Sequence, residues 1–138
     1  MSKFFEELDH TADWTIRVWG GSLEQLFENA AAAMFLLQGA EPEAEARLES
    51  SVAIGAPDLE ALMVAWLNEL LLLSEVQDGL FTGFAVSTDQ SDRGYELTGT
   101  ARGVAGRGHL AHIKATTYWD LFVGCVNGRW EATITFDT

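Results

Sequence analysis

Two aspartates lie at the ends of apolar segments, and their carboxylates could together bind a cation. Asp13 directly precedes segment 14–18, in which apolar residues alternate as they do on one face of a strand. Asp137 follows a second alternating segment, 130–136, and Thr138 can add a backbone oxygen and a terminal carboxylate. Two aspartates with carbonyl oxygens suit a hard divalent ion, and we expect Ca²⁺, with Mg²⁺ or Mn²⁺ as alternatives. The competing interpretation is structural, with Asp13 capping a turn and Asp137 belonging to a frayed tail.

Three further polar residues could act beside these carboxylates. His10 could position Asp13 or contact a partner, and its alternative role is a structural hydrogen bond. Lys114 is one of only eight basic residues and could pair with a carboxylate of the metal site or with a phosphate. Its alternative role is a surface salt bridge. Glu69 could orient this lysine, or it could simply belong to a solvated helix face.

The charge of the chain limits its partners. Eight basic residues face 21 acidic ones, which gives a formal net charge of −13 over 138 residues. Such a surface repels phosphate backbones, because proteins bind nucleic acids largely through Lys and Arg. We therefore expect no strong direct binding to nucleic acid, and instead docking on a basic protein or binding of cations.

The composition predicts a single cytoplasmic domain spanning residues 1–138. A chain of this length with 48% hydrophobic residues can bury a core without disulfides. The only cysteine, Cys125, excludes an internal disulfide and is typical of a reducing compartment. Its alternation with Leu121 and Val123 predicts a buried or half-buried side chain. The longest apolar stretches are far shorter than the ~20 residues that cross a bilayer, so we expect no membrane association.

The elements that must position these residues can be read from periodicity and turn signals. Ser22, with Gln25 three residues on, begins a helix that ends at Gly39, and Pro57-Asp58 begins a second helix that ends at 77–79. Predicted strands cover 14–18, 47–55, 81–87, 95–103, 110–118, 121–126 and 129–136. This order predicts an α+β fold with two helices packed on one side of a mainly antiparallel sheet.

The dipeptide Asn127-Gly128 predicts a two-residue hairpin, which fixes a register. Val126 then faces Arg129, Phe122 faces Thr133, and Tyr118 faces Asp137. Alternation places the even-numbered residues 130–136 on the core face. The odd-numbered residues 131–137 then lie on the opposite, wetter face.

Four segments, in order and at matching spacing, resemble the archease family. The first segment is Asp9-His10-Thr11-Ala12-Asp13 together with residues 19–30, and the second is residues 58–71, which include Trp66-Leu67-Asn68-Glu69. The third segment is Ile113-Lys114-Ala115-Thr116-Thr117-Tyr118, and the fourth is Phe136-Asp137-Thr138. The resemblance covers the whole chain. It implies a fold of duplicated strand-helix-strand-strand modules and a divalent-metal site formed by Asp13, Asp137 and the backbone of Thr138. The family commonly has a histidine where this chain has Trp119, so any role of that histidine is missing here.

The resemblance also implies a function. Archeases are non-catalytic partners of the tRNA-splicing RNA ligase, which joins 2′,3′-cyclic or 3′-phosphate RNA ends to 5′-hydroxyl ends. They promote guanylylation of the ligase and allow multiple turnover, and no small-molecule substrate is expected. Two alternatives remain open from the residues alone. One is a metal-dependent phosphohydrolase that uses the same aspartates, and the other is a metal-stabilised, protein-binding chaperone module.

Overall fold

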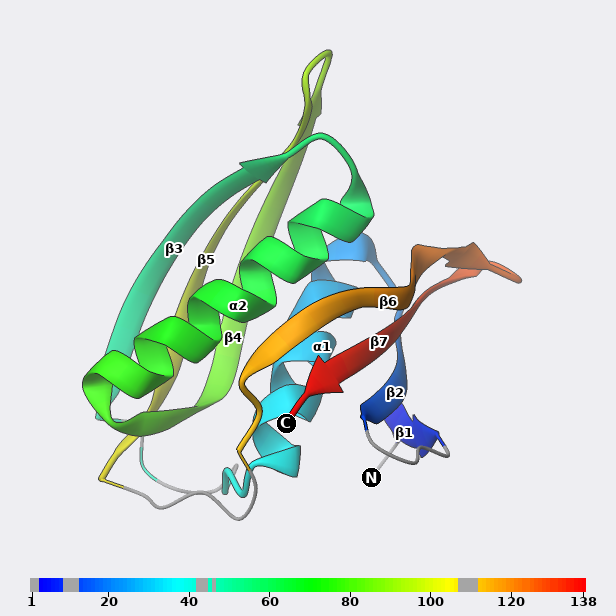
Figure 1. Cartoon of the computed structure of the whole chain (residues 1–138). Coiled ribbons are helices and arrows are strands. Elements are labelled where there is room, and N and C mark those ends of the chain that lie inside the picture. The colour runs from blue at the N-terminus through cyan, green and yellow to red at the C-terminus, as the bar shows by residue number, and fades with distance from the viewer. Residues whose placement is uncertain (1–2, 9–12, 42–44, 46, 107–111) are drawn as a thin grey trace.

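A computed structural model of the chain describes residues 3–8, 13–41, 45, 47–106 and 112–138. It confirms the α+β class, with two helices and antiparallel strands (Figure 1). The helices are α1 (Leu23–Leu37) and α2 (Leu59–Gln77). The strands are β1 (Phe5–Leu8), β2 (Trp14–Gly20), β3 (Leu48–Ala56), β4 (Gly79–Ser91), β5 (Gly94–Ala105), β6 (Ala115–Val126) and β7 (Arg129–Asp137).

Both helices begin at the capping residues that the sequence indicates. The Ser22 hydroxyl accepts a hydrogen bond from the backbone N–H of Gln25 at 3.1 Å, which satisfies a free donor of the first turn of α1. Asp58 does the same for the backbone N–H of Ala61 at 2.8 Å and begins α2. Asp78 ends α2 in the left-handed conformation, with φ of 51°. Among the described residues, no helix is both long and apolar enough to span a membrane.

The strands form two sheets rather than the single sheet expected. One has four strands in the order β1-β2-β7-β6, and the other has three in the order β3-β5-β4. The smaller sheet is a continuous strand-helix-strand-strand module, β3-α2-β4-β5, whose last strand lies at the centre. A second strand-helix-strand-strand module consists of β2, α1, β6 and β7, and its last strand, β7, again lies between the other two. The β3-α2-β4-β5 module is inserted into it between α1 and β6. This nested duplication explains why the strands divide into two sheets, and it confirms the duplicated modules that the family resemblance implies.

The hydrophobic core lies where the helices meet the sheets. Helix α1 contacts β2 and β4, and α2 contacts β3 and β6, so each helix packs against both sheets. Trp66 of α2 is fully buried, and its indole N–H donates to the carbonyl of Phe27 of α1 at 3.0 Å. This hydrogen bond joins the two modules at the level of the helices and satisfies the polar atom of a buried ring.

Three local differences from the expected elements have simple causes. Strand β1 was not predicted, because its sequence Phe5-Glu6-Glu7-Leu8 does not alternate between apolar and polar residues. Segments 110–118 and 121–126 were predicted as separate strands, but 115–126 form one irregular strand, β6. The prediction for Cys125 was wrong, since its side chain is exposed. It lies near the tip of the β6–β7 hairpin, which extends beyond the helices (Figure 1).

Candidate functional site

Asp13 and Asp137 lie at the same end of the four-stranded sheet. Strands β2 and β7 are antiparallel, with Trp14 paired to Phe136. The next step of this register brings Asp13 opposite Asp137. Directly opposed residues of antiparallel strands project to the same face, with Cβ atoms about 4.5–5.5 Å apart. Both aspartates are exposed, so their carboxylates lie in water at this end of the sheet.

The face that carries these aspartates is less open than the alternation predicts. Thr135, two residues before Asp137, is only 2% exposed. It lies in the central strand with Thr15 on one side, at 3.0 Å between the two hydroxyl oxygens, and Thr117 on the other. The Thr117 hydroxyl donates to the carbonyl of Thr135 at 3.0 Å. This face is therefore closed at Thr135, while Asp137 at its end is exposed.

Lys114, which directly precedes β6, lies at the same end of the sheet. Ala115 pairs with Asp137, and the backbone N–H of Lys114 donates to the Asp137 carbonyl at 2.8 Å. Lys114 is thereby placed opposite Thr138. The structure thus brings together four of the residues singled out from the sequence: Asp13, Asp137, Thr138 and Lys114. Within the described ranges, Lys114 forms no ion pair.

The predicted register of the hairpin is correct near the turn and wrong near the site. Val126 pairs with Arg129 and Phe122 with Thr133, as expected. The register then shifts between Thr117 and Phe122, so Ala115 rather than Tyr118 lies opposite Asp137. The cause is a bulge in β6, within which Asp120 adopts a left-handed conformation with φ of 54°.

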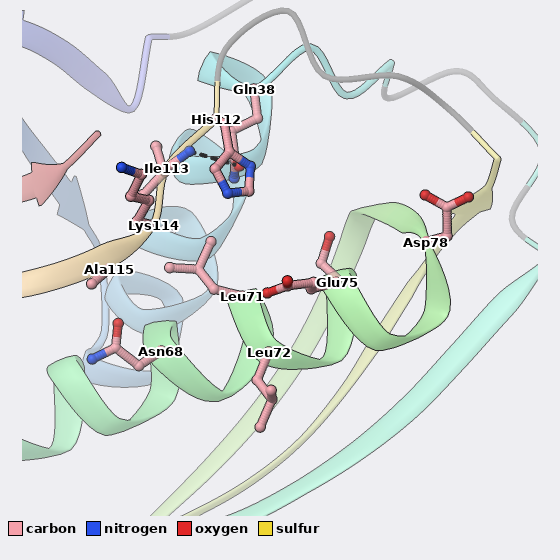
Figure 2. Close-up of a pocket in the computed structure, with 11 residues that line it drawn as sticks. Gln38, Asn68, Leu71, Leu72, Glu75, Asp78, His112, Ile113, Lys114 and Ala115 are labelled. Atoms are coloured by element: carbon pink, nitrogen blue, oxygen red, sulfur yellow. Dashed lines mark hydrogen bonds between the residues drawn. The ribbon is translucent and has the colours of Figure 1, made fainter.

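A cavity of about 280 Å³, lined by both polar and apolar residues, lies on the α2 side of Lys114 (Figure 2). Glu75 and Asp78 line it from the C-terminal part of α2, while Lys114 and His112 line it from the segment that enters β6. Gln38 lies at its inner end, where its side-chain carbonyl accepts the backbone N–H of Ile113 at 3.2 Å. The lining therefore contains both carboxylates and cationic or ionisable groups.

Glu69, which the sequence suggested could orient Lys114, is not brought to it in the described structure. Glu69 neither lines the cavity nor has a hydrogen bond or ion pair to Lys114 among the described contacts. Its neighbour Asn68 is the α2 residue that reaches β6. The Asn68 side-chain carbonyl accepts the backbone N–H of Thr116 at 2.7 Å. His10, like Asp9, lies outside the described residues.

Two residues that hold β6 in place were not assigned this role from the sequence. They are Asn68 and Glu60, whose carboxylate accepts the backbone N–H of Val123 at 3.3 Å. From the sequence, Asn68 was singled out only as part of the family-like segment 58–71. A polar residue beside the apolar stripe of α2 is the sequence signal that could have identified it.

The donor set at the end of the sheet fits a hard cation. Asp13 and Asp137 supply carboxylate oxygens and Thr138 a backbone oxygen, the ligand type that Ca²⁺, Mg²⁺ and Mn²⁺ prefer. No cluster of three or more His, Cys, Asp or Glu side chains with metal-ligating geometry occurs among the described residues. A cation bound here would therefore have two side-chain ligands and would keep several waters.

Comparisons with known proteins agree with this architecture. Residues 5–138 match the model of the Archease protein family. The chain is 36% identical over 140 residues to protein archease of Methanosarcina mazei, covering 98% of this chain and 96% of the relative. It is 36% identical over 138 residues to protein archease of Methanothermobacter thermautotrophicus, covering 98% and 99%.

Solved structures show the same fold. The solution structure of protein 1598 of Methanobacterium thermoautotrophicum superimposes with a TM-score of 0.85 at 36% identity, covering 97% of this chain and 98% of that one. The crystal structure of an archease from Thermotoga maritima, described as a possible chaperone, gives a TM-score of 0.63 at 23% identity, covering 96% of each chain. The second likeness concerns the fold alone. The family match and the identities over nearly the whole length establish that this chain belongs to the archease family.

Proposed function

We propose that this protein is a non-catalytic activator of an RNA ligase that joins 2′,3′-cyclic or 3′-phosphate RNA ends to 5′-hydroxyl ends. Membership of the archease family supports the proposal, because the family resemblance implies that role. The single observation that carries it is that the pairing of β2 with β7 puts Asp13 and Asp137 at one exposed end of the four-stranded sheet. This arrangement offers opposed carboxylates at an exposed end of a sheet, where a partner protein can reach them.

Different residues are assigned to docking and to activation. The net charge of −13 attracts a basic ligase surface and speeds the encounter. Asp13, Asp137 and the backbone of Thr138 hold a divalent cation at the contact, where it would help to neutralise nucleotide phosphates during guanylylation of the ligase histidine. Lys114 lies opposite Thr138 at the same end of the sheet, and its side chain lines the cavity on the helix side, from which it could contact a partner.

The test is ligation by a purified cytoplasmic ligase at substoichiometric concentration, with GTP and RNA bearing the two kinds of ends. Wild-type protein should raise the product well above one joined RNA per ligase molecule. Asp13→Asn and Asp137→Asn should remain folded and lose most of this stimulation, because each removes a carboxylate without changing the side-chain shape. The control for the loss of one negative charge is Asp92→Asn, because Asp92 lies in the exposed turn between β4 and β5, in the other sheet.

Three outcomes would count against this proposal or part of it. Full stimulation by both folded variants would contradict the metal-site mechanism. If calcium raises the thermal stability while wild-type protein leaves ligase turnover unchanged, the protein is better described as a metal-stabilised chaperone module, in line with the possible chaperone from Thermotoga maritima. Release of phosphate from nucleotides by the protein alone would instead indicate a phosphohydrolase.

A further inference from the structure

Three aromatic residues of the β6 bulge are exposed. Tyr118 is 62%, Trp119 73% and Phe122 41% exposed, and we call these three residues the aromatic ridge. Large aromatic side chains gain much free energy from burial, so several of them exposed within five residues are a typical feature of an interaction surface. The core residues show that this chain buries such side chains elsewhere, since Trp66 and Phe136 are fully buried.

The exposure follows from the backbone of the bulge. Thr117 still pairs with Thr135, but the next pair along the strand is Phe122 with Thr133, so β6 carries extra residues between them. The hydroxyl of Thr117 accepts the backbone N–H of Trp119 at 3.3 Å and turns the chain locally. Asp120 then takes its left-handed conformation. A bulge of this kind redirects side chains that regular alternation would send into the core.

Helix α2 holds the bulge at both of its ends. Before the bulge, Asn68 accepts the backbone N–H of Thr116 at 2.7 Å and donates to its carbonyl at 3.4 Å. After the bulge, Glu60 accepts the backbone N–H of Val123 at 3.3 Å. Strand β6 is an edge strand, and these side chains occupy backbone groups that no neighbouring strand pairs. The aromatic ridge is therefore anchored before a partner binds, which lowers the entropic cost of binding.

The aromatic ridge lies next to the candidate site on the same strand. Ala115 pairs with Asp137, and Tyr118 follows three residues later. At about 3.3 Å per residue, the ridge begins roughly 10 Å from the aspartates. A partner protein that covers the ridge would therefore extend over the carboxylates as well.

The charge of the chain identifies the chemistry of the partner. Aromatic faces attract guanidinium and ammonium groups, and this attraction grows where carboxylates lie nearby, as Asp120 does within the bulge. Stacking of RNA bases on the same rings is opposed by the net charge of −13, which repels the phosphates. Tyr and Trp are also the residues that most often dominate the affinity of protein interfaces.

We propose that the aromatic ridge is the docking surface for a basic, arginine-bearing face of the RNA ligase, with Trp119 and Tyr118 stacked on its cationic side chains. The inference rests on the proposed function. In this inference the aromatic ridge provides affinity for the ligase, while Asp13 and Asp137 provide activation. A titration can separate affinity from activation.

The experiment titrates each variant into the ligation assay and measures the half-maximal concentration and the maximal stimulation. Trp119→Ala should raise the half-maximal concentration about thirtyfold, the scale of an interface hot spot, while saturating protein still gives near-full stimulation. Asp137→Asn should lower the maximum with little change in the half-maximal concentration. Val76→Ala is the matched control, because Val76 is also 73% exposed but lies on α2. Direct binding of each variant to the ligase is measured in parallel.

An unchanged half-maximal concentration for folded Trp119→Ala and Tyr118→Ala, with wild-type protein still stimulating, would overturn the docking inference alone. Absence of both ligase binding and stimulation by wild-type protein would contradict the proposed function together with the inference. Binding of single-stranded RNA by the free protein, lost in Trp119→Ala while ligase binding persists, would show that the aromatic ridge serves RNA instead.

Discussion

Asn68 of α2 forms two hydrogen bonds to the backbone of Thr116, one to its N–H and one to its carbonyl. A helix side chain thereby takes the place of a neighbouring strand at the edge of the four-stranded sheet. Thr116 is only 4% exposed, so water cannot replace these bonds in the folded protein. The position of β6 relative to the helices depends on this contact.

We expect Asn68→Ala to lower the free energy of unfolding by about 1–3 kcal/mol, because it leaves buried backbone groups of Thr116 unsatisfied. Denaturant unfolding measures the loss, and hydrogen exchange should show faster exchange at the Thr116 amide. Asn68→Asp keeps the hydrogen-bond acceptor and loses the donor, so its free energy of unfolding should lie between those of Asn68→Ala and the wild-type protein. Equal stability of Asn68→Ala and wild-type protein would mean that β6 is held by other contacts.

Calcium should stabilise the wild-type protein through Asp13 and Asp137. At a concentration one hundred times the dissociation constant, a ligand that binds only the folded state adds about 2.7 kcal/mol. Thermal unfolding with and without calcium measures this gain. Asp137→Asn should abolish it and Asp92→Asn should retain it. A similar rise in melting temperature for Asp13→Asn and Asp137→Asn would place calcium elsewhere on the molecule.

The Glu24 carboxylate should contribute a pH-dependent stability. The Thr88 hydroxyl donates a hydrogen bond to it, and this bond, with a backbone contribution in the first turn of α1, lowers the pKa of Glu24 below its ordinary value of 4.5. The resulting stabilisation is fully present above the ordinary pKa and is lost as the pH falls through the lowered pKa.

NMR titration of the Glu24 carboxyl tests this expectation. Thr88→Val should raise the pKa toward its ordinary value and reduce stability at neutral pH more than at low pH. Thr98→Val, at an exposed position of β5, is the matched control and should leave the titration of Glu24 unchanged. A Glu24 pKa unaffected by Thr88→Val would assign the shift to the helix end rather than to the hydroxyl.

Two glycines of the three-stranded sheet should respond to alanine in opposite ways. A Cβ at Gly103 would collide with the backbone of Leu80 and Phe81, and backbone atoms cannot move aside cheaply. A Cβ at Gly83 would meet nothing within 4 Å. We expect Gly103→Ala to destabilise the fold by about 1–3 kcal/mol. Gly83→Ala should be neutral or stabilising by about 0.5–1 kcal/mol. Denaturant midpoints compare the two, and equal effects would contradict the close packing at Gly103.

The elements of the fold could be predicted where local signals are strong. Ser22 and Asp58 mark the helix starts, and Asn127-Gly128 sets the hairpin turn. The division into two sheets could not be seen, because alternation reports which face of a strand is buried and not which strand pairs with it.

The surroundings of the candidate site were predictable only in part. The places of Asp13 and Asp137 at the ends of two alternating segments could be predicted, whereas the pairing of these two strands is known only from the structure. The β6 bulge could not be predicted, because residues 117–122 contain no glycine, and the positive φ of Asp120 is a conformation that aspartate adopts only occasionally. Because the bulge was not predicted, Tyr118 was expected opposite Asp137, where the structure has Ala115, three residues earlier. The exposure of Trp119 could not be predicted for the same reason.

The nested arrangement of the two modules has a consequence for how the protein is made. On the ribosome, β3, α2, β4 and β5 emerge as a contiguous unit that can fold early, whereas β2 must wait for β7, the last strand in the chain. Pairings between residues so distant in sequence form late and slowly. Asp13 and Asp137 therefore reach the same end of the sheet only after β7 has been synthesised and has paired with β2, so a copy truncated before β7 would lack the proposed cation site.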